Sequence, residues 1–245
     1  MPERYEYFCV RRWRAWSPGI TEVEGWRAWL AGDTAPARET PVDVSYLPPL
    51  LRRRLGSMGR MALAVAGQCA TGETALPTVF ASRHGELQRT VELLQALARH
   101  EPLSPTDFSL SVHNSAAGLF SIARRDRSPA TAVAAGDDTL AAGLIEGFGM
   151  LAEGMPQVLV VYADAPPPEP YAGRVVAQQA AFAAALLLRP DALGEGRCRL
   201  AKVRGRAAPP SAELRRSLIG FLLGREPLSL GACGWNMERV GNAEH

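Results

Sequence analysis

The sequence predicts a layered α/β fold in which helices cover a buried sheet. Apolar strand-like runs alternate with helical patterns through the first two-thirds of the chain, which is typical of this class. One stretch, 128–164, has the pattern strand, tight turn, helix, strand, and parallel strands need such a crossover. With 245 residues the chain can bury a large core without disulfide or metal staples. We expect residues 1–245 to form a single domain.

Composition and charge exclude several classes of protein. Hydrophobic residues make up 47% of the chain and charged residues 21%, so it is neither disordered nor a collagen or coiled coil. The net charge of +2 gives no global reason to expect nucleic acid as a partner. Basic residues gather between Arg197 and Arg216, and either a solvated surface or a docking patch would explain them.

Cysteine spacing and the apolar runs indicate a cytoplasmic chain without a membrane span. Cys9, Cys69, Cys198 and Cys233 are far apart, without a C-x-x-C pair or a nearby histidine, so we expect reduced thiols and no metal site. The start of the sequence interleaves charges with aromatic residues and lacks the apolar segment of a signal peptide. The most apolar run, Ala180–Leu188, is too short to cross a bilayer.

The first part of the chain contains five predicted elements. Alternation of aromatic and basic residues favours a strand, and helical spacing of apolar residues favours helices. The predicted elements are a strand over Phe8–Trp16, a helix over Gly25–Leu30, a helix from about Leu50 to Gly67, a strand over Pro77–Ser82, and a helix with Leu87, Val91, Leu94 and Ala98 on one face.

The second part begins with a strand-like piece over Ser109–His113, after which Asn114 suits the N-cap of a helix. A buried strand over Thr131–Ala135, a turn at Gly136 and Asp137, and a helix follow. The later predicted elements are that helix with its stripe Leu140, Leu144, Phe148 and Leu151, a strand over Val158–Tyr162, a strand region over Val175–Leu188, a strand over Arg199–Val203, a helix over Ser211–Leu223 and a short tail.

Two motif-like patterns do not support the chemistry that they suggest. Gly147, Gly149 and Ala152 match G-x-G-x-x-A, but they lie inside the helix stripe rather than at a strand-to-helix turn, so no dinucleotide and no other cofactor is expected. Gly143 and Gly147 more plausibly allow close packing on a neighbour. His113 beside Ser115 suggests a nucleophile with its base, yet no third orienting group is evident.

The order of elements around the turn resembles a known family. SPTDFSLSVHNSAAGLFSIA followed by PATAVAAGDDTLAAGLIEGFGMLAEG is similar to the N-terminal half of a β-ketoacyl synthase, a condensing enzyme of thiolase-like fold. In that family an asparagine-containing helix, a strand, a T-A-C-A-S-like nucleophile turn, a long buried helix and a strand follow one another. VFASRHGEL and AQQAAFAAALLL resemble an earlier junction and the closing strand. The resemblance extends over 8–188 and leaves 189–245 as a divergent extension.

Two departures from the family change what the resemblance implies. Aligning VAAGDDTLAAGL with the family pattern puts Asp137 at the cysteine nucleophile, or Gly136 if the register shifts by one. A helix N-terminus stabilises a thiolate, whereas a carboxylate there is a weak nucleophile toward a thioester. A complete condensing enzyme also takes two catalytic histidines from a second half, but the only histidine after Leu188 is the terminal His245. The second half is therefore expected to be missing or vestigial.

This combination resembles chain length factors, the inactive partners of ketosynthases, and especially the truncated kind of aryl polyene biosynthesis. The resemblance implies a non-catalytic subunit that forms a heterodimer or heterotetramer with an active β-ketoacyl synthase and shapes the acyl or polyene pocket. In related enzymes the strand before the nucleophile pairs across the dimer axis, which would place Ala130–Ala135 at an interface. The tunnel or interface candidates are His113, Asn114, Leu119, Phe120 and Val133.

Some alternatives stay open from the sequence alone. Leu119 and Phe120 would equally well fill this subunit's own core. Arg204 and Arg206 are candidates for docking an acidic acyl carrier protein. A free-standing acyltransferase or thioesterase using Ser115 with His113, or a self-associating structural protein, would also fit the degenerate half.

Overall fold

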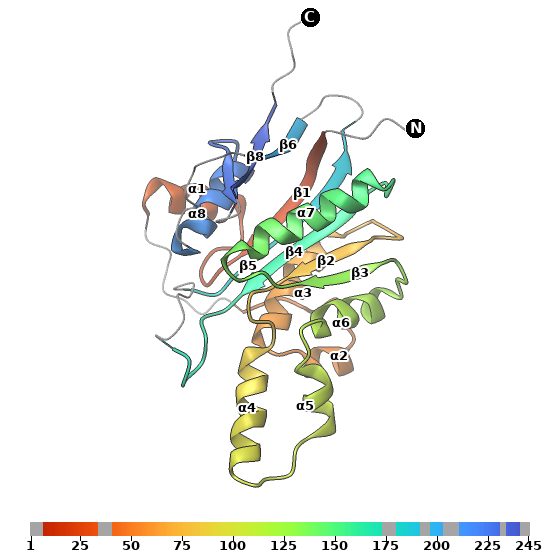
Figure 1. Ribbon diagram of the computed structural model, residues 1–245, viewed down its shortest axis with the longest axis vertical. Coiled ribbons are helices and arrows are strands. Elements are labelled where there is room, and N and C mark those ends of the chain that lie inside the picture. The colour runs from red at the N-terminus through yellow and green to blue at the C-terminus, as the bar shows by residue number, and fades with distance from the viewer. Residues whose placement is uncertain are drawn as a thin grey trace, which may run out of the picture.

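The computed structural model describes residues 7–33, 41–172, 180–191, 197–202, 211–230 and 234–240. They contain an eight-stranded sheet of order β3-β2-β4-β5-β1-β6-β8-β7 (Figure 1). The strands are β1 (Phe8–Trp16), β2 (Thr78–Ala81), β3 (Ala130–Val133), β4 (Val158–Asp164), β5 (Phe182–Pro190), β6 (Arg197–Lys202), β7 (Leu228–Leu230) and β8 (Trp235–Arg239). The helices are α1 (Val23–Ala31), α2 (Pro49–Arg54), α3 (Ser57–Cys69), α4 (Leu87–Ala98), α5 (Pro105–Leu110), α6 (Ser115–Arg124), the 3₁₀ turn η1 (Gly136–Asp138), α7 (Thr139–Ala152) and α8 (Ser211–Leu222). The predicted layered α/β fold is confirmed.

The parallel part of the sheet consists of β3, β2 and β4. Strand β2 pairs in parallel with both neighbours, so the carboxyl ends of all three strands lie at one end of the sheet. The next pairs, β4 with β5 and β5 with β1, are antiparallel. Every residue of β4 is buried, which is expected of a strand with helices on both faces.

Helices cover the two faces of the sheet in separate clusters. One face packs against α1, α7 and α8, and the other against α3 and α6. Helix α7 comes close to the sheet through its glycines: a Cβ at Gly147 would lie 2.5 Å from Val160 Cγ2, and one at Gly143 would lie 2.8 Å from Ala81 Cβ. The close-packing role predicted for these glycines is confirmed.

The helix predicted over Leu50–Gly67 is two helices, so that prediction is wrong in its continuity. Leu55 has φ −76° and ψ 127°, and Gly56 has φ −71° and ψ 177°, both extended. A Cβ at Gly56 would collide with the Glu86 carboxylate. The chain therefore turns between α2 and α3, where the buried side chain of Glu86, directly before α4, comes close.

The strand predicted over Ser109–His113 is also wrong, because this segment belongs to α5 and the turn after it. Ser104 caps α5 by accepting a hydrogen bond from the Asp107 amide at 3.2 Å, and Pro105 follows at the first helical position. Asn114 occupies the N-cap position of α6, but its side chain makes no capping bond. Helical hydrogen bonding thus satisfies a backbone that the apolar alternation had suggested to be extended.

Three further predictions need correction. Strand β3 is half-exposed rather than buried, because it lies at the sheet edge. The apolar face predicted for α4 is buried only in part: Val91 is buried, but Leu94 is exposed. The tail after Leu223 carries β7 and β8, which pair with each other and extend the sheet beyond β6. Parts of the strands predicted over Val175–Leu188 and Arg199–Val203 lie outside the described residues.

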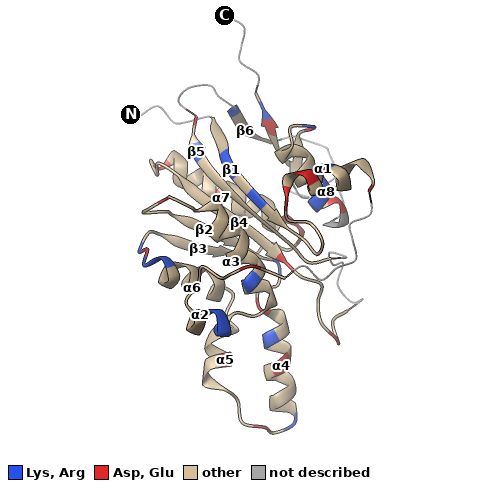
Figure 2. Cartoon of the chain, turned by 180° about the vertical axis from the view of Figure 1, so that it is seen from behind, with Lys and Arg blue, Asp and Glu red and all other residues tan. Residues whose placement is uncertain are grey.

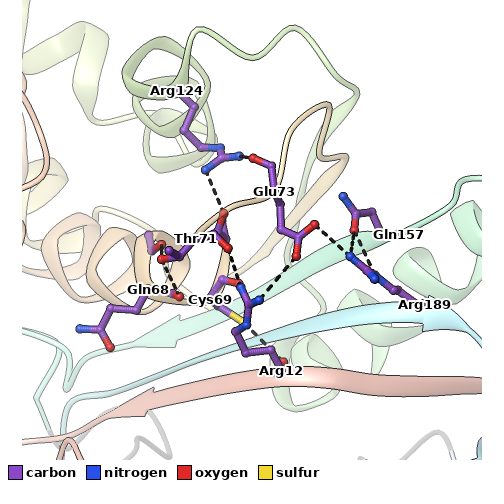
Figure 3. A network of polar contacts seen from close by, with 10 residues as sticks. Arg12, Gln68, Cys69, Thr71, Glu73, Arg124, Gln157 and Arg189 are labelled. Atoms are coloured by element: carbon purple, nitrogen blue, oxygen red, sulfur yellow. Dashed lines mark hydrogen bonds and ion pairs between the residues drawn. The ribbon is translucent and has the colours of Figure 1, made fainter. Parts of the chain in front are cut away.

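A polar network connects several elements at the end of the sheet where the parallel strands β2 and β4 begin (Figure 3). The Glu73 carboxylate, in the loop between α3 and β2, lies 2.9 Å from Arg189 Nη2 and 3.6 Å from Arg12 Nη2. Arg124 of α6 donates to the Glu73 carbonyl at 2.7 Å, and Arg189 also donates to Gln157 Oε1 at 2.7 Å. One loop therefore ties β1, β5 and α6 together, which leaves the opposite strand ends for other contacts.

Candidate functional site at the carboxyl ends of the parallel strands

Polar residues follow each of the three parallel strands where it ends. Ser82 and Arg83 follow β2, Asp164 ends β4, and Asp137 follows β3. Ligand sites of open α/β sheets commonly lie outside these carboxyl ends. The family resemblance and the topology therefore direct attention to the same end of the sheet.

Asp164 is the buried centre of this polar group, with 4% of its surface exposed. Its Oδ1 accepts hydrogen bonds from Ser82 Oγ at 3.0 Å and from the Arg83 amide at 2.9 Å. Burial raises the pKa of the Asp164 carboxyl above its ordinary value, while these hydrogen bonds act in the opposite direction. The carboxyl group thus fixes the end of β2 to the end of β4.

The turn after β3 is held by Thr139. Its Oγ1 accepts from the Ala135 amide at 3.0 Å and donates to the Gly136 carbonyl at 2.7 Å. Gly136 has φ +57°, a left-handed conformation that glycine adopts without steric cost. This places Asp137 directly before α7, the position at which the family resemblance aligns it with the nucleophile turn.

Asp137 is exposed and forms an ion pair with Arg83 (Figure 2 shows the charges of the chain). A carboxylate held by a guanidinium is a stabilised anion and a weak nucleophile. Because Asp164 holds the Arg83 amide, the contacts Asp164–Arg83–Asp137 connect the ends of β4, β2 and β3. Among the described residues, no cluster of three or more His, Cys, Asp or Glu could hold a metal ion.

His113 and Asn114 lie beside this group but are not joined into a nucleophile–base pair with Ser115. The His113 Nε2 atom is 2.7 Å from the Ser82 carbonyl oxygen, and a Cβ at Gly85 would lie 2.9 Å from His113 Cδ2. Ser115 is buried at the start of α6, and Asn114 is exposed. His113 therefore packs in the loop as a hydrogen-bonded histidine.

The remaining predicted site residues are dispersed. Leu119 and Phe120 are buried in this chain's own core, where Phe120 packs edge-on against Phe80 with centroids 5.7 Å apart. Val133 is half-buried against the cluster under α7. Arg204 and Arg206 lie outside the described residues.

Sequence reasoning missed a set of exposed apolar side chains around α4, α5 and α6. Phe108 is 64% exposed, Leu97 57% and Ile122 60%. Leu94, Leu103 and Val112 are also exposed. Helices α4 and α5 project from the body as a helical hairpin (Figure 1).

A small polar pocket lies between the start of α3 and the loop after β4. Its lining includes Ser57, His84, Glu86 and Asp164. Burial lowers the pKa of His84 and raises that of Glu86. The pocket's volume of about 60 Å³ is far below the ~300–1,000 Å³ of typical ligand sites, so it could not enclose an acyl chain within this subunit.

A search of curated protein sequences gave no significant match. One solved structure, a ketosynthase (ApeO) in complex with its chain length factor (ApeC) from Xenorhabdus doucetiae, contains a chain that is 31% identical, with 95% of this chain and 99% of that chain covered and a TM-score of 0.81.

Two longer chains share the fold at lower identity. The ishigamide ketosynthase/chain length factor is 17% identical, with 76% of this chain and 62% of that chain covered and a TM-score of 0.60. A chain from a structure of a type II PKS acyl-carrier protein in complex with its ketosynthase is 12% identical. In that match 76% of this chain and 64% of that chain are covered, and the TM-score is 0.62. This chain thus spans less than two-thirds of their length.

The model of the family described as "Beta-ketoacyl synthase, N-terminal domain" matches residues 26–218 of this chain. The expected thiolase-like ketosynthase fold is confirmed by this match and by the structural likenesses. Within the described residues, no helix is both long and apolar enough to span a membrane. By its match over most of its length, the chain belongs to the β-ketoacyl synthase family and has the fold of that family's N-terminal half.

Proposed function

We propose that this chain is a non-catalytic, chain length factor-like subunit that pairs with an active β-ketoacyl synthase and shapes the pocket for its growing acyl or polyene chain. The observation that carries the proposal is the Arg83–Asp137 ion pair at the turn where the family has its cysteine nucleophile. An intact turn with a neutralised carboxylate keeps the fold of the site without its covalent chemistry.

The likenesses support the same class of protein. The 31% identical chain is matched over 99% of its length, so it is about as short as this one. It comes from a complex of a ketosynthase with its chain length factor. We therefore propose that the complex makes an aryl polyene or a related product.

The exposed apolar surface favours a protein partner. Strand β3 is an edge strand, and its outer N–H and C=O groups can pair with a strand of another chain. Phe108, Val112 and Ile122 are exposed on α5, the following turn and α6, and α6 contacts β3. Large contiguous apolar patches mark interaction sites, and an obligate interface often buries more than ~2,000 Å². We place the ketosynthase against this side, with residues 109–122 and 130–135 in contact.

The first experiment is co-expression with a β-ketoacyl synthase from the same organism. The two should co-purify, and incubation with acyl carrier thioester and a malonyl donor should acylate the ketosynthase alone, as measured by intact mass. The ketosynthase's own adduct is the positive control. A stable adduct on this chain would overturn the non-catalytic role, and a stable, monodisperse monomer that ignores the ketosynthase would overturn the partnership.

The second experiment tests the strand edge. The carbonyls of Pro129 and Val133 accept from the amides of Thr78 and Ser82 at 3.0 and 3.1 Å. By the alternation of a ladder, Ala132 therefore directs its backbone groups outward. Ala132→Pro removes that outward N–H and should abolish pairing while the subunit still folds; Ala132→Val is the matched control. A substitution at Val133 would be less informative, because Val133 also packs on the core.

A further inference from the structure

The turn between α6 and β3 contains three arginines within four residues, and two of them are open to a partner. Arg125 and Arg127 are exposed, whereas Arg124 is held inward by bonds to the carbonyls of Ala70 and Glu73 at 3.4 and 2.7 Å. Figure 2 shows basic residues at this end of α6, beside β3. No ion pair in the described part of the chain involves Arg125 or Arg127. The turn therefore presents positive charge at its surface.

Asp126 fixes the backbone of this turn. Its Oδ2 atom accepts a hydrogen bond from the Leu76 amide at 2.9 Å, and its Oδ1 atom accepts one from the Ser128 amide at 2.9 Å. The Pro129 carbonyl accepts from the Thr78 amide at 3.0 Å, which joins the turn to β2. Because its carboxylate binds backbone amides, Asp126 holds the turn in one shape, and the arginine on each side of it is carried by a fixed backbone.

The turn leads directly into the outer edge of the sheet. The carbonyls of Pro129 and Val133 are directed at β2, so the backbone groups of residues 130, 132 and 134 are directed outward. A partner of the same fold that joins its equivalent strand about a twofold axis adds that strand antiparallel. Pairing centred on Ala132 uses all three outward residues of both strands, so it is the register that forms the most hydrogen bonds.

This register decides which part of the partner lies opposite the arginine turn. In an antiparallel pair, residues equally far before and after the centre lie level with each other. With the centre at Ala132, Arg127 lies level with the partner position equivalent to Asp137 of this chain. With the centre at Thr131, the opposite position is the equivalent of Ala135, in the same turn. In either register the partner's nucleophile turn faces Arg127.

We propose that Arg127 lies in trans beside the nucleophile turn of the ketosynthase, so that this chain places a fixed positive charge next to the partner's cysteine. The inference rests on the proposed function, which supplies the ketosynthase and its position on β3. A nearby cation stabilises a thiolate relative to the thiol, and arginine keeps its charge throughout the working pH range. Arg127 is thus a positioning residue for charge and takes part in no covalent step.

The placement is tested by cross-linking in the co-purified complex of this chain with the ketosynthase. A short bis-maleimide should join Arg127→Cys to the nucleophilic cysteine of the ketosynthase, and intact mass should show one copy of each chain. Arg27→Cys, which is exposed on α1, is the matched control and should give no product, as should wild type. An absent product for Arg127→Cys, or one that persists when the ketosynthase cysteine is changed to alanine, would overturn the placement.

The charge is tested by the rate at which iodoacetamide alkylates the ketosynthase cysteine in the complex, measured across pH. Arg127→Gln should lower the rate at neutral pH by ~3-fold or more and move the profile to higher pH, because the thiolate loses a neighbouring cation. Arg127→Lys should restore most of the rate, and Arg27→Gln should not change it. Equal profiles for wild type and Arg127→Gln would overturn the role of the charge.

Two further outcomes separate this inference from the proposed function. Because Arg127 is exposed, its variants should keep the wild-type urea midpoint and still pair with the ketosynthase. Loss of pairing in Arg127→Lys, which keeps the charge, would overturn the inference, because the side chain would then act through packing. A wild-type chain that does not pair with the ketosynthase would overturn the proposed function and this inference together. A normal wild-type complex without the cross-link would overturn this inference alone.

Discussion

Helix α7 and the α4–α5 hairpin are both rich in apolar residues, yet they use them in opposite ways. Leu140, Leu144 and Leu151 of α7 are buried, and Gly143 and Gly147 bring that helix against the sheet. In the hairpin, Val91 is the buried residue of α4, and α5 has none. The difference separates apolar residues that stabilise this chain from those that we assign to another protein.

The first prediction, with the largest effect, concerns the hairpin. Phe108→Glu with Val112→Glu, at the end of the hairpin, should weaken the ketosynthase complex by about 100-fold or more, because two apolar contacts are replaced by charges without partners. The isolated chain should unfold at the same urea concentration as wild type, because both side chains are exposed. Affinity is measured by titration of the ketosynthase. If the double variant unfolds at a lower urea concentration but binds the ketosynthase normally, these residues stabilise this chain and do not contact the partner.

The second prediction contrasts two glycines of α7. Gly147→Ala should lower the free energy of unfolding by about 1–3 kcal/mol, because its Cβ would meet Val160. Gly149→Ala meets nothing within 4 Å and should raise it by about 0.5–1 kcal/mol, the ordinary helix preference. Urea denaturation measures both. Equal effects at the two positions would show that α7 is not closely packed.

The third prediction tests the polar network around Glu73. Glu73→Gln leaves Arg189 and Arg12 without their counter-charge, and it should cost about 1–2 kcal/mol of stability, with partial solvent screening already included. Glu101→Gln breaks the fully exposed Arg99 pair and should leave the unfolding midpoint unchanged. If Glu73→Gln leaves the unfolding midpoint unchanged, packing alone holds the loop.

The smallest effect concerns pH. Because burial raises the pKa of Asp164 in the folded protein, the folded chain keeps this proton at pH values where the unfolded chain has lost it. Stability therefore declines as pH rises from the ordinary carboxyl pKa to the raised pKa, and this contribution is constant above it. Asp164→Asn should flatten the decline, as measured by urea midpoints across that interval. Glu86, whose pKa burial also raises, contributes a slope of the same sign.

Local patterns in the sequence predicted the elements that carry their own signal. The strand-turn-helix unit around Asp137 was recognisable because Gly136, a buried stripe and an apolar strand follow in order. The helix α5 was missed although Ser104 and Pro105 form a recognisable start, because the apolar residues after them suggested a strand. Strands β7 and β8 are only 3 and 5 residues long; β8 pairs with β6 and β7 pairs with β8.

Contacts between distant residues were beyond the sequence. Arg83 and Asp137 are 54 positions apart, and only the parallel pairing of β2 with β3 brings them together. The same holds for Glu86, which lies 27 positions from the Gly59 amide that it accepts from and breaks the predicted helix at Gly56. A single sequence shows the residue types of such pairs but not which of them meet.

The paired carboxylate at the turn after β3 has a consequence for stoichiometry. A pair of two active condensing subunits has two acyl acceptors, and chains can grow on both at once. With Asp137 held by Arg83, the proposed pair would have a single acceptor, so each complex would extend one chain at a time. The number of growing chains would then equal the number of partner cysteines.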